Sequence, residues 1–214
     1  MNKGLVCVAG IDVASGTMVR PLMSDGSNWE ESRWVDGGYL QVGNLVSFEA
    51  AAQTQSAYPH ASEDFRASTV EVKANLSRDR VHAACIETAD AAVEAIFDGN
   101  LVDGKYVAEN SRCRSLGCII VPARKLRTSA AYGKIQVSFR DDAGEWHNFP
   151  VTELEARKAA SVEDGAALLA KRLAAHPYGH AALRLGLARG WVGSQQEYDP
   201  KRCYLQLNGL ILPA

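Results

Sequence analysis

Residues 7–12 read Cys-Val-Ala-Gly-Ile-Asp, and residues 19–22 read Val-Arg-Pro-Leu. Near the other end of the chain, residues 185–191 read Leu-Gly-Leu-Ala-Arg-Gly-Trp and residues 203–210 read Cys-Tyr-Leu-Gln-Leu-Asn-Gly-Leu. Each pair of stretches combines short apolar runs with an arginine set beside them. Short apolar runs bounded by turn residues are typical of β-strands. Both ends of the chain therefore predict strands and favour a mainly β fold.

Composition limits the range of functions. The chain has 214 residues, enough for one well-buried domain or two small ones, and its formal net charge is −2. A protein of this charge can bind nucleic acid only through a local basic face. No apolar run approaches the ~18 residues that a spanning helix needs, and residues 1–4 lead at once into a strand-like run. We expect a cytoplasmic protein with no membrane partner.

The five cysteines are scattered, and most of them lie in apolar runs. Reduced cysteine in such a context behaves as a small buried hydrophobic residue. The alternative is a zinc site that combines Cys113 and Cys118 with His176 and His180. Those spacings are not the spacings of a common zinc module, so we expect free thiols, no metal and no cofactor.

The first half predicts strands joined by turns, followed by one helix. Strands are expected at residues 4–12, 18–23, 45–49 and 68–74, and a loop at residues 24–38. Residues 88–98 predict a helix with Thr88 as the N-cap and Gly99 as its end. The polar residues 99–112 are expected to link the two halves.

The second half predicts more strands and two helices. Residues 134–139 and 146–151 form a hairpin around Asp141–Gly144, and further strands are expected at residues 116–121, 183–188 and 204–212. The helices are expected at residues 152–160 and 162–175. Strands spaced by turns favour a barrel or a sandwich over a parallel α/β sheet.

The order and spacing of these motifs resemble a bacterial family of dual OB-containing domains. Besides the terminal stretches, the resemblance rests on Cys113–Gly117, on His60–Phe65 and on the hairpin segments Tyr132–Lys134 and Pro150–Thr152. It implies two OB-like β-barrels in tandem in a mainly β protein with α additions (α+β), predicted nucleic-acid binding and a link to antiviral defence. We place the first barrel at residues 1–82, a helix and linker at residues 83–110, and the second barrel with a helical insertion at residues 111–214.

The chain departs from the family pattern in two places. Only residues 1–6 precede the Cys-Val-Ala-Gly motif, where relatives have a further strand segment, and Met18 stands where relatives have tryptophan. We therefore expect a first barrel that is either trimmed or completed by another chain, because an open edge strand is a ready pairing site. The resemblance supplies no catalytic residues.

Arginines near strand ends are the first candidates for binding nucleic acid. A guanidinium such as that of Arg20 can hold a phosphate through two hydrogen bonds, or it can pair with Asp12 or Asp36 and pin the barrel. Arg112 and Arg114 alternate on one strand face and can form an oxyanion-binding corner with Ser115, or they can be an ordinary solvated strand start.

Basic residues beside aromatic rings are the second set of candidates. Such residues can bind single-stranded nucleic acid through charge and stacking, although charged loops also serve only as soluble surface; they are Arg124, Lys125, Arg127, Tyr132, Lys134, Arg189 and Trp191. On the last strand, Gln206 and Asn208 are expected to face outward with Tyr204 and can hydrogen-bond to nucleobases. Alternatively, Asn208 precedes Gly209 only as part of a bulge or turn.

These patterns favour a non-catalytic accessory protein that binds single-stranded DNA or RNA. It would act beside an enzymatic partner, such as a nuclease or helicase, in a defence or DNA-processing system. No nucleophile signature, phosphate-binding loop or metal motif occurs in the sequence, so we do not expect an enzyme. Two alternatives stay open: an adaptor subunit of a multi-protein complex, and a sensor of a nucleotide-like anionic ligand between the barrels. We expect the second half to carry more of the binding.

Overall fold

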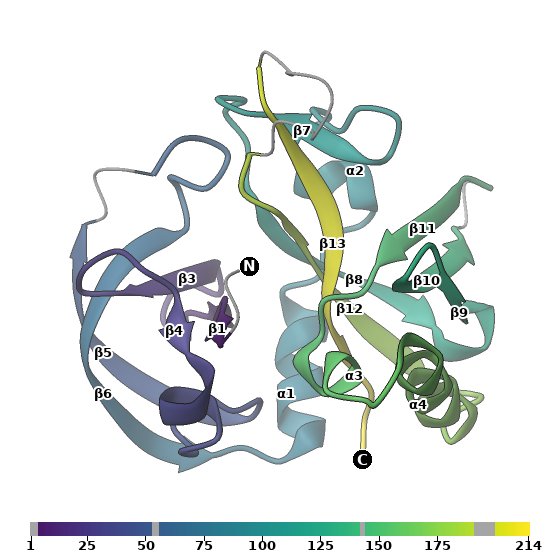
Figure 1. Ribbon diagram of the computed structural model, residues 1–214, viewed down its shortest axis with the longest axis horizontal. Helices are drawn as coiled ribbons and strands as arrows, with labels where there is room; N and C mark the ends of the chain where they lie inside the picture. The colour runs from purple at the N-terminus through teal and green to yellow at the C-terminus, as the bar shows by residue number, and fades with distance from the viewer. Residues whose placement is uncertain (1–3, 53–55, 142–143, 191–199) are drawn as a thin grey trace.

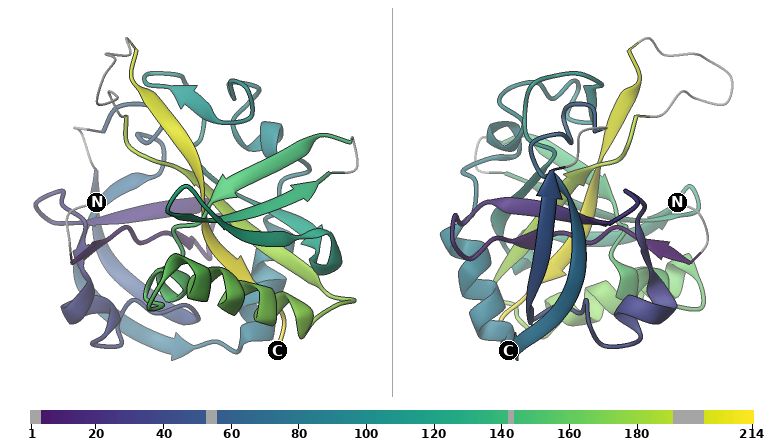
Figure 2. Two further views of the ribbon diagram at one scale, coloured as in Figure 1. Left: turned by 45° about the vertical axis from the view of Figure 1, so that its right-hand side comes forward. Right: turned by 90° about the vertical axis from the view of Figure 1, so that its left-hand side faces the viewer.

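The computed structural model describes residues 4–52, 56–141, 144–190 and 200–214. The chain forms two β-rich halves side by side, with the N-terminal half on the left of Figure 1 and the C-terminal half on the right. The left view in Figure 2 shows the same division after a 45° turn, and in the right view the N-terminal half faces the viewer. Helix α1 (Arg78–Glu87) follows the first half and packs against strands of the second.

The first half is built on one four-stranded sheet. Its strand order is β2-β3-β6-β5, in which β3 and β6 run parallel and the other neighbours run antiparallel. A separate two-stranded sheet pairs β1 with β4. The strands are β1 (Leu5–Val6), β2 (Gly10–Ile11), β3 (Met18–Met23), β4 (Trp29–Glu30), β5 (Asn44–Ala52) and β6 (Asp64–Asn75).

Two predictions for the first half need correction. The single strand expected over residues 4–12 is broken into β1 and β2, which belong to different sheets. Residues 24–38 are not all loop, because β4 and a π-helical turn (Glu31–Val35) lie within them. Trp29 is 1% exposed, and its indole N–H donates to the Pro21 carbonyl oxygen at 2.7 Å. The tryptophan therefore belongs to the core of this half.

The helix expected at residues 88–98 is also misplaced. Helix α1 begins after Ser77, whose side-chain oxygen accepts a hydrogen bond from the Arg80 backbone N–H. Thr88 is the C-cap of this helix and not an N-cap, since its backbone N–H and its hydroxyl both donate to the Ala84 carbonyl oxygen and the next helix begins only after Ala92. A short helix, α2 (Val93–Ile96), follows. The linker expected at residues 99–112 contains strand β7 (Tyr106–Ala108), which pairs with the last strand of the chain.

The second half has two sheets joined through the last strand. One sheet has the order β7-β13-β12-β8 and the other has the order β11-β10-β9. The Thr152 backbone N–H donates to the Leu207 carbonyl oxygen and connects the end of β11 to β13. The strands are β8 (Leu116–Pro122), β9 (Arg127–Ala131), β10 (Lys134–Arg140), β11 (Trp146–Pro150), β12 (His180–Leu187) and β13 (Arg202–Ile211).

The hairpin and the long helix of the second half confirm the sequence-based predictions. Strands β10 and β11 pair from Gln136 to Arg140, and β9, which was not predicted, pairs along the other side of β10. Helix α4 (Val162–Ala174) is capped by Ser161, whose side-chain oxygen accepts from the Asp164 backbone N–H. A short helix, α3 (Leu154–Arg157), precedes it, and a 3-10 turn (Ala123–Lys125) lies between β8 and β9.

The two halves differ in how much core they bury. The main hydrophobic cluster lies in the second half and includes Phe139, Phe149, Leu183 and Leu207. In the first half the cluster around Trp29 has few fully buried members, and most of the apolar side chains packed on it are partly exposed. Because burial of apolar area is the main stabilising term, the second half contributes more to stability.

Most of the cysteines lie in the core, as predicted. Cys85, Cys113, Cys118 and Cys203 are buried, whereas Cys7 is exposed. Cys113 and Cys118 belong to different hydrophobic clusters. Within the described residues, no group of three or more possible metal ligands comes together.

Gly165 in α4 provides a test of how the helix packs on the sheet. A methyl group at this position would collide with the Ile135 side chain and would lie 2.5 Å from the Ala156 carbonyl oxygen. Replacing glycine by alanine in a helix normally adds ~1 kcal/mol of stability, whereas overpacking costs about 1–3 kcal/mol. The backbone carbonyl cannot move away easily. We therefore expect Gly165→Ala to lower the free energy of unfolding measured by denaturant titration.

The matched control is Ala167→Gly on the exposed side of the same helix. It should cost ~1 kcal/mol through helix propensity alone. A Gly165→Ala variant more stable than the wild type would contradict the packing of α4.

Candidate nucleic-acid interface

A buried polar network joins the two halves through Arg20 on β3. Its guanidinium donates from Nη1 to Asp64 Oδ1 at 2.9 Å and from Nη2 to the Ser115 hydroxyl at 3.0 Å. Nη1 also lies 3.0 Å from His60 Nδ1. Because arginine can only donate, Nδ1 of His60 must be the acceptor and the ring proton lies on Nε2. Arg20 is 3% exposed, so these contacts are shielded from water.

Glu63 and Arg189 complete the network from opposite sides. The Glu63 carboxylate accepts hydrogen bonds from the Ser115 backbone N–H at 2.6 Å, from the Ser115 hydroxyl at 2.7 Å and from the Leu116 backbone N–H at 3.0 Å. Arg189, just beyond β12, pairs with Asp64 Oδ2 at 2.8 Å. Residues 20, 60, 63 and 64 come from the first half and the others from the second, so the network binds the halves together.

The protonation states of the network follow from burial and charge. Burial and the neighbouring charges of Arg20 and Arg189 lower the pKa of His60 to about 3, so the ring is neutral at physiological pH. Burial raises the pKa of Glu63, although the hydrogen bonds from Ser115 oppose it. At Asp64 burial also acts to raise the pKa, but the Ser56 hydrogen bond and the two arginines outweigh it and leave the pKa below its ordinary value.

The contacts of Arg20 favour a structural ion pair over phosphate binding. The partner of Arg20 is neither of the two predicted carboxylates. Asp12 accepts hydrogen bonds within its own turn, and Asp36 pairs with Lys158. Neither forms the predicted pair with Arg20, because Asp64 on the neighbouring parallel strand lies directly opposite it. The side chain of Arg189 remains half exposed.

Arg112 and Arg114 do not alternate along a strand, because β8 begins only at Leu116. Arg114 pairs with Asp90 at 2.6 Å, and the Arg112 guanidinium lies 5.9 Å from the Tyr58 ring centroid. Ser115 donates to Glu63 and accepts from Arg20. The predicted oxyanion-binding corner is not formed, since Ser115 is fully buried in the network.

The outward face of the sheet β9-β10-β11 collects polar, basic and aromatic side chains. The pairing register places Arg127 beside Ser138 and Arg140 beside Trp146 on one face, while Ile135, Val137 and Phe139 are buried on the other. The outward positions are Arg127, Ser129, Ala131, Lys134, Gln136, Ser138, Arg140, Trp146, Asn148 and Pro150. None of these positions, all within the described chain, carries a carboxylate.

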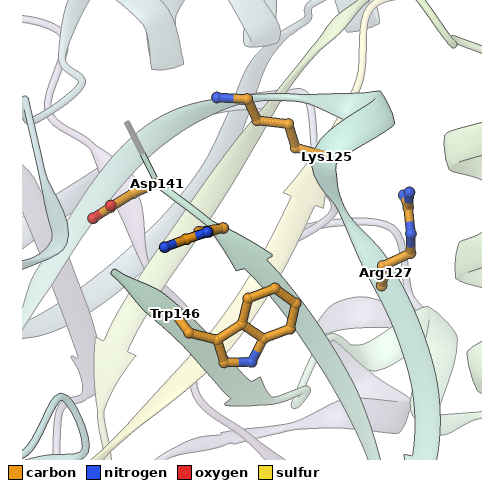
Figure 3. Close-up of a pocket in the computed structure, with 5 residues that line it drawn as sticks. Lys125, Arg127, Asp141 and Trp146 are labelled. Carbon is orange, nitrogen blue, oxygen red and sulfur yellow. The ribbon is translucent and has the colours of Figure 1, made fainter. Parts of the chain in front are cut away.

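Trp146 marks one end of this face. Its side chain is 64% exposed and borders a pocket of about 360 Å³ lined by Lys125, Arg127, Arg140 and Asp141. Figure 3 shows Lys125 and Arg127 on one segment of chain, across from the indole ring, and Asp141 on the other side. An exposed ring beside cations can stack a base while the cations hold its phosphates.

The remaining members of the basic cluster lie around the same sheet. Tyr132 is 98% exposed in the tight turn between β9 and β10, and Arg124 is exposed in the 3-10 turn before β9. Sequence reasoning missed Arg140 and Trp146. The signal was present, because both residues alternate with buried neighbours in the predicted hairpin.

A large cleft of about 1730 Å³ separates the two halves. Lys134, Asn148 and Pro150 line it, so the outward face of β10 and β11 leads directly into it. Its basic lining residues are Arg20, Arg78, Lys105, Lys134, Arg157, Lys158, Arg172, Arg184 and Arg189, against the acidic residues Asp36, Glu153 and Glu155. The cleft therefore concentrates positive charge in a chain of net charge −2.

The last strand contributes polar groups to the cleft as predicted. Leu205 and Leu207 are buried, whereas Gln206 and Asn208 line the cleft. Asn208 is also the extra residue of a β-bulge, because Arg184 pairs with Gly209 while Leu185 pairs with Leu207. The predicted bulge at Asn208 is confirmed, whereas hydrogen bonding of Asn208 to nucleobases stays a prediction. Trp191 lies outside the described residues.

Both halves are built mainly of short strands, the architectural class to which the OB fold belongs. The model of the dual OB-containing domain matches residues 1–210, so the chain belongs to that family. No curated protein and no solved structure matches the sequence. The protein thus has two OB-like barrels, and OB domains generally bind nucleic acids. None of the helices in the described part of the chain is long and apolar enough to cross a membrane.

The buried ion pair at Arg20 generates a prediction about stability. Removing one partner of a buried pair leaves the other charge without compensation, which costs about 3–5 kcal/mol. We expect Arg20→Met to lower the free energy of unfolding by that amount in denaturant titration. The control is Lys73→Met, which breaks the exposed pair of Lys73 with Glu71 and should change stability by less than ~1 kcal/mol. Equal effects in the two variants would argue against the network.

The pKa of His60 generates a prediction about pH. Its ordinary value is 6.5 and its value in the folded protein is about 3, so the unfolded chain binds the proton more readily. This contribution to stability is fully present above pH 6.5 and is lost as the pH falls from 6.5 toward 3. The free energy of unfolding of the wild type, measured by thermal melts, should therefore fall by up to about 1.4 kcal/mol for each pH unit in that window through this group.

Substitution separates His60 from other titrating groups. The raised pKa of Glu63 acts in the opposite direction as the pH rises above 4.5, so the wild-type slope is a sum. His60→Asn keeps an acceptor for Arg20 and should lose the histidine part of the slope. The control His180→Asn, at an exposed position, should keep it. If His60→Asn keeps the wild-type slope of unfolding free energy against pH, another titrating group causes the pH dependence.

Proposed function

We propose that this protein binds single-stranded DNA or RNA along the outward face of β9, β10 and β11. The observation that carries the proposal is the exposed indole of Trp146 among Lys125, Arg127 and Arg140. The carboxylate of Asp141, which also lines this pocket, lies 2.8 Å from His147 Nε2 and accepts a hydrogen bond from the Glu145 backbone N–H. Membership in the dual OB-containing domain family supports it, because OB folds commonly bind oligonucleotides on strand faces.

Each group on this face has a defined role in the proposal. Trp146 stacks a base, which does not depend on sequence because every base has a flat aromatic surface. Arg127, Arg140 and Lys134 bind phosphates along the strand, and Arg127 and Arg140 can each offer two parallel donors. Gln136 and Asn148 lie between the cations on the same face and offer amide groups to base edges.

We further propose that the protein is a non-catalytic, cytoplasmic accessory subunit in a defence or DNA-processing system. Ser115 is buried and its hydroxyl is engaged on both sides, which supports a structural role for the network around it. An enzymatic partner, such as a nuclease or helicase, would then supply the chemistry. The adaptor alternative predicts a protein that docks the same partner without nucleic acid.

Two substitutions on the sheet face should have different signatures in a salt series. Trp146→Ala should weaken binding of a fluorescent oligothymidylate or oligouridylate by about 1–3 kcal/mol with little change in salt slope, because stacking releases no counterions. Arg140→Glu should weaken binding and also reduce the slope of log K against log salt by at least ~0.7, the contribution of one phosphate contact.

The control is Lys73→Glu on β6, an exposed lysine of the first half. It should leave both affinity and slope near the wild-type values. Wild-type binding in both Trp146→Ala and Arg140→Glu would exclude this face as the site. Absence of binding by the wild type at low salt would favour the adaptor.

A further inference from the structure

Arg184 occupies an unusual position in the inter-half cleft. It lies in the middle of β12, on the sheet face that looks toward the first half, and it is only partly exposed. Its strand neighbours in register are Cys118 on β8 and Gly209 on β13, neither of which bears a carboxylate. The one hydrogen bond of its guanidinium within the described chain goes from Nη2 to the Met18 sulfur, at 3.9 Å.

The charge of Arg184 therefore has no carboxylate partner among the described residues. Its Nε is buried and has no acceptor there. Other arginines of the cleft for which ion pairs are seen differ in this respect, since Arg172 pairs with Glu153 and Arg189 pairs with Asp64. Arg78 and Arg157 differ from Arg184 in being exposed. A cation in a partly buried place without a counter-ion costs stability, and a bound anion would supply the missing charge.

Two amide side chains stand on the same face as Arg184. Gln206 lies opposite Gly186, two residues along β12 from Arg184. Asn208 places its Nδ2 directly over Gly186, where any side chain would collide with it. The Thr152 hydroxyl donates to Asn208 Oδ1 at 2.9 Å, so the amide is held with its oxygen engaged and its nitrogen available as a donor. Because Gly186 has no side chain, the Asn208 amide can lie against this face of the sheet, which forms the floor of the cleft together with Arg184 and Gln206.

We propose that the floor of the cleft is a phosphate-binding site, in which Arg184 supplies the charge and the side-chain amides of Gln206 and Asn208 supply further donors. A guanidinium with adjacent N–H donors is suited to an oxyanion. The volume of about 1730 Å³ leaves room for a phosphate-bearing molecule larger than a single phosphate. Either a free nucleotide or the phosphodiester backbone of a bound strand has this chemistry.

Calorimetric titration with two probes tests the site and separates the two sources. The probes are ATP and a short oligothymidylate, and the variants are Arg184→Met, Gln206→Glu and the control Arg80→Met on the exposed side of α1, outside the cleft. We expect Arg184→Met and Gln206→Glu each to weaken at least one probe by about ten-fold or more, and Arg80→Met to leave both unchanged.

Each pattern of results has a defined meaning. Loss confined to ATP identifies a free nucleotide as the ligand, whereas loss of oligothymidylate binding by a protein that never binds ATP identifies the strand backbone. Wild-type affinity of both probes in Arg184→Met and Gln206→Glu, or binding of neither probe by the wild type, would overturn the site. Trp146→Ala and Arg140→Glu should leave ATP binding intact, so failure of the sheet-face proposal is distinguishable from failure of this one.

Thermal melting of the same variants provides a second readout. Because Arg184 has no carboxylate partner in the part of the chain that the structure describes, Arg184→Met should melt at or above the wild-type temperature without ligand. Gln206→Glu introduces a carboxylate at a partly exposed position and keeps the fold testable if the arginine variant does not fold. A clear fall in the melting temperature of Arg184→Met would show that the arginine serves stability, and it would count against a ligand role.

Discussion

The buried ion pair between Arg20 and Asp64 is the contact on which the arrangement of the two halves depends. It joins parallel strands β3 and β6 at the point where the first half meets the second. Both charges have left water, so each needs the other and the hydrogen bonds around them. Ser115 and Arg189 supply those bonds from the second half. If the two halves moved apart, some of these charged groups would lose their partners, which would cost free energy. The cleft between the halves is therefore a preformed feature of the fold.

The placement of its charges lets a chain with a slight negative net charge present basic surfaces. Several carboxylates are consumed in pairs, such as Glu153 with Arg172 and Asp90 with Arg114. The outward face of β9, β10 and β11 and the floor of the cleft lack such partners in the described chain. Positive potential is therefore local, and it lies where concave surfaces concentrate it. Our proposals assign stability and binding to different arginines: those with carboxylate partners hold the structure, and those without bind the ligand.

Much of the fold was predictable because several elements carry a regular pattern. The alternation in β10, β11 and β13 and the capped helix α4 all place apolar residues at the expected period. Helix α1 was missed because only His82 and Cys85 are buried on it, so it has almost no apolar stripe. Strand β7 was missed because it is short and is stabilised by pairing with β13, which is distant in sequence.

The sequence alone determined the family, the β-rich class and the general region of positive charge, because these depend on local pattern and on motif order. Only the tertiary structure decided which charged residues are available. Arg20 looks like a binding arginine in the sequence, but Asp64 lies opposite it across the parallel pair. Arg184 looks like an interruption of an apolar strand, yet the fold places it in a cleft without a carboxylate partner among the described residues. Availability depends on what lies across space from a side chain, and residues distant in the chain provide those neighbours.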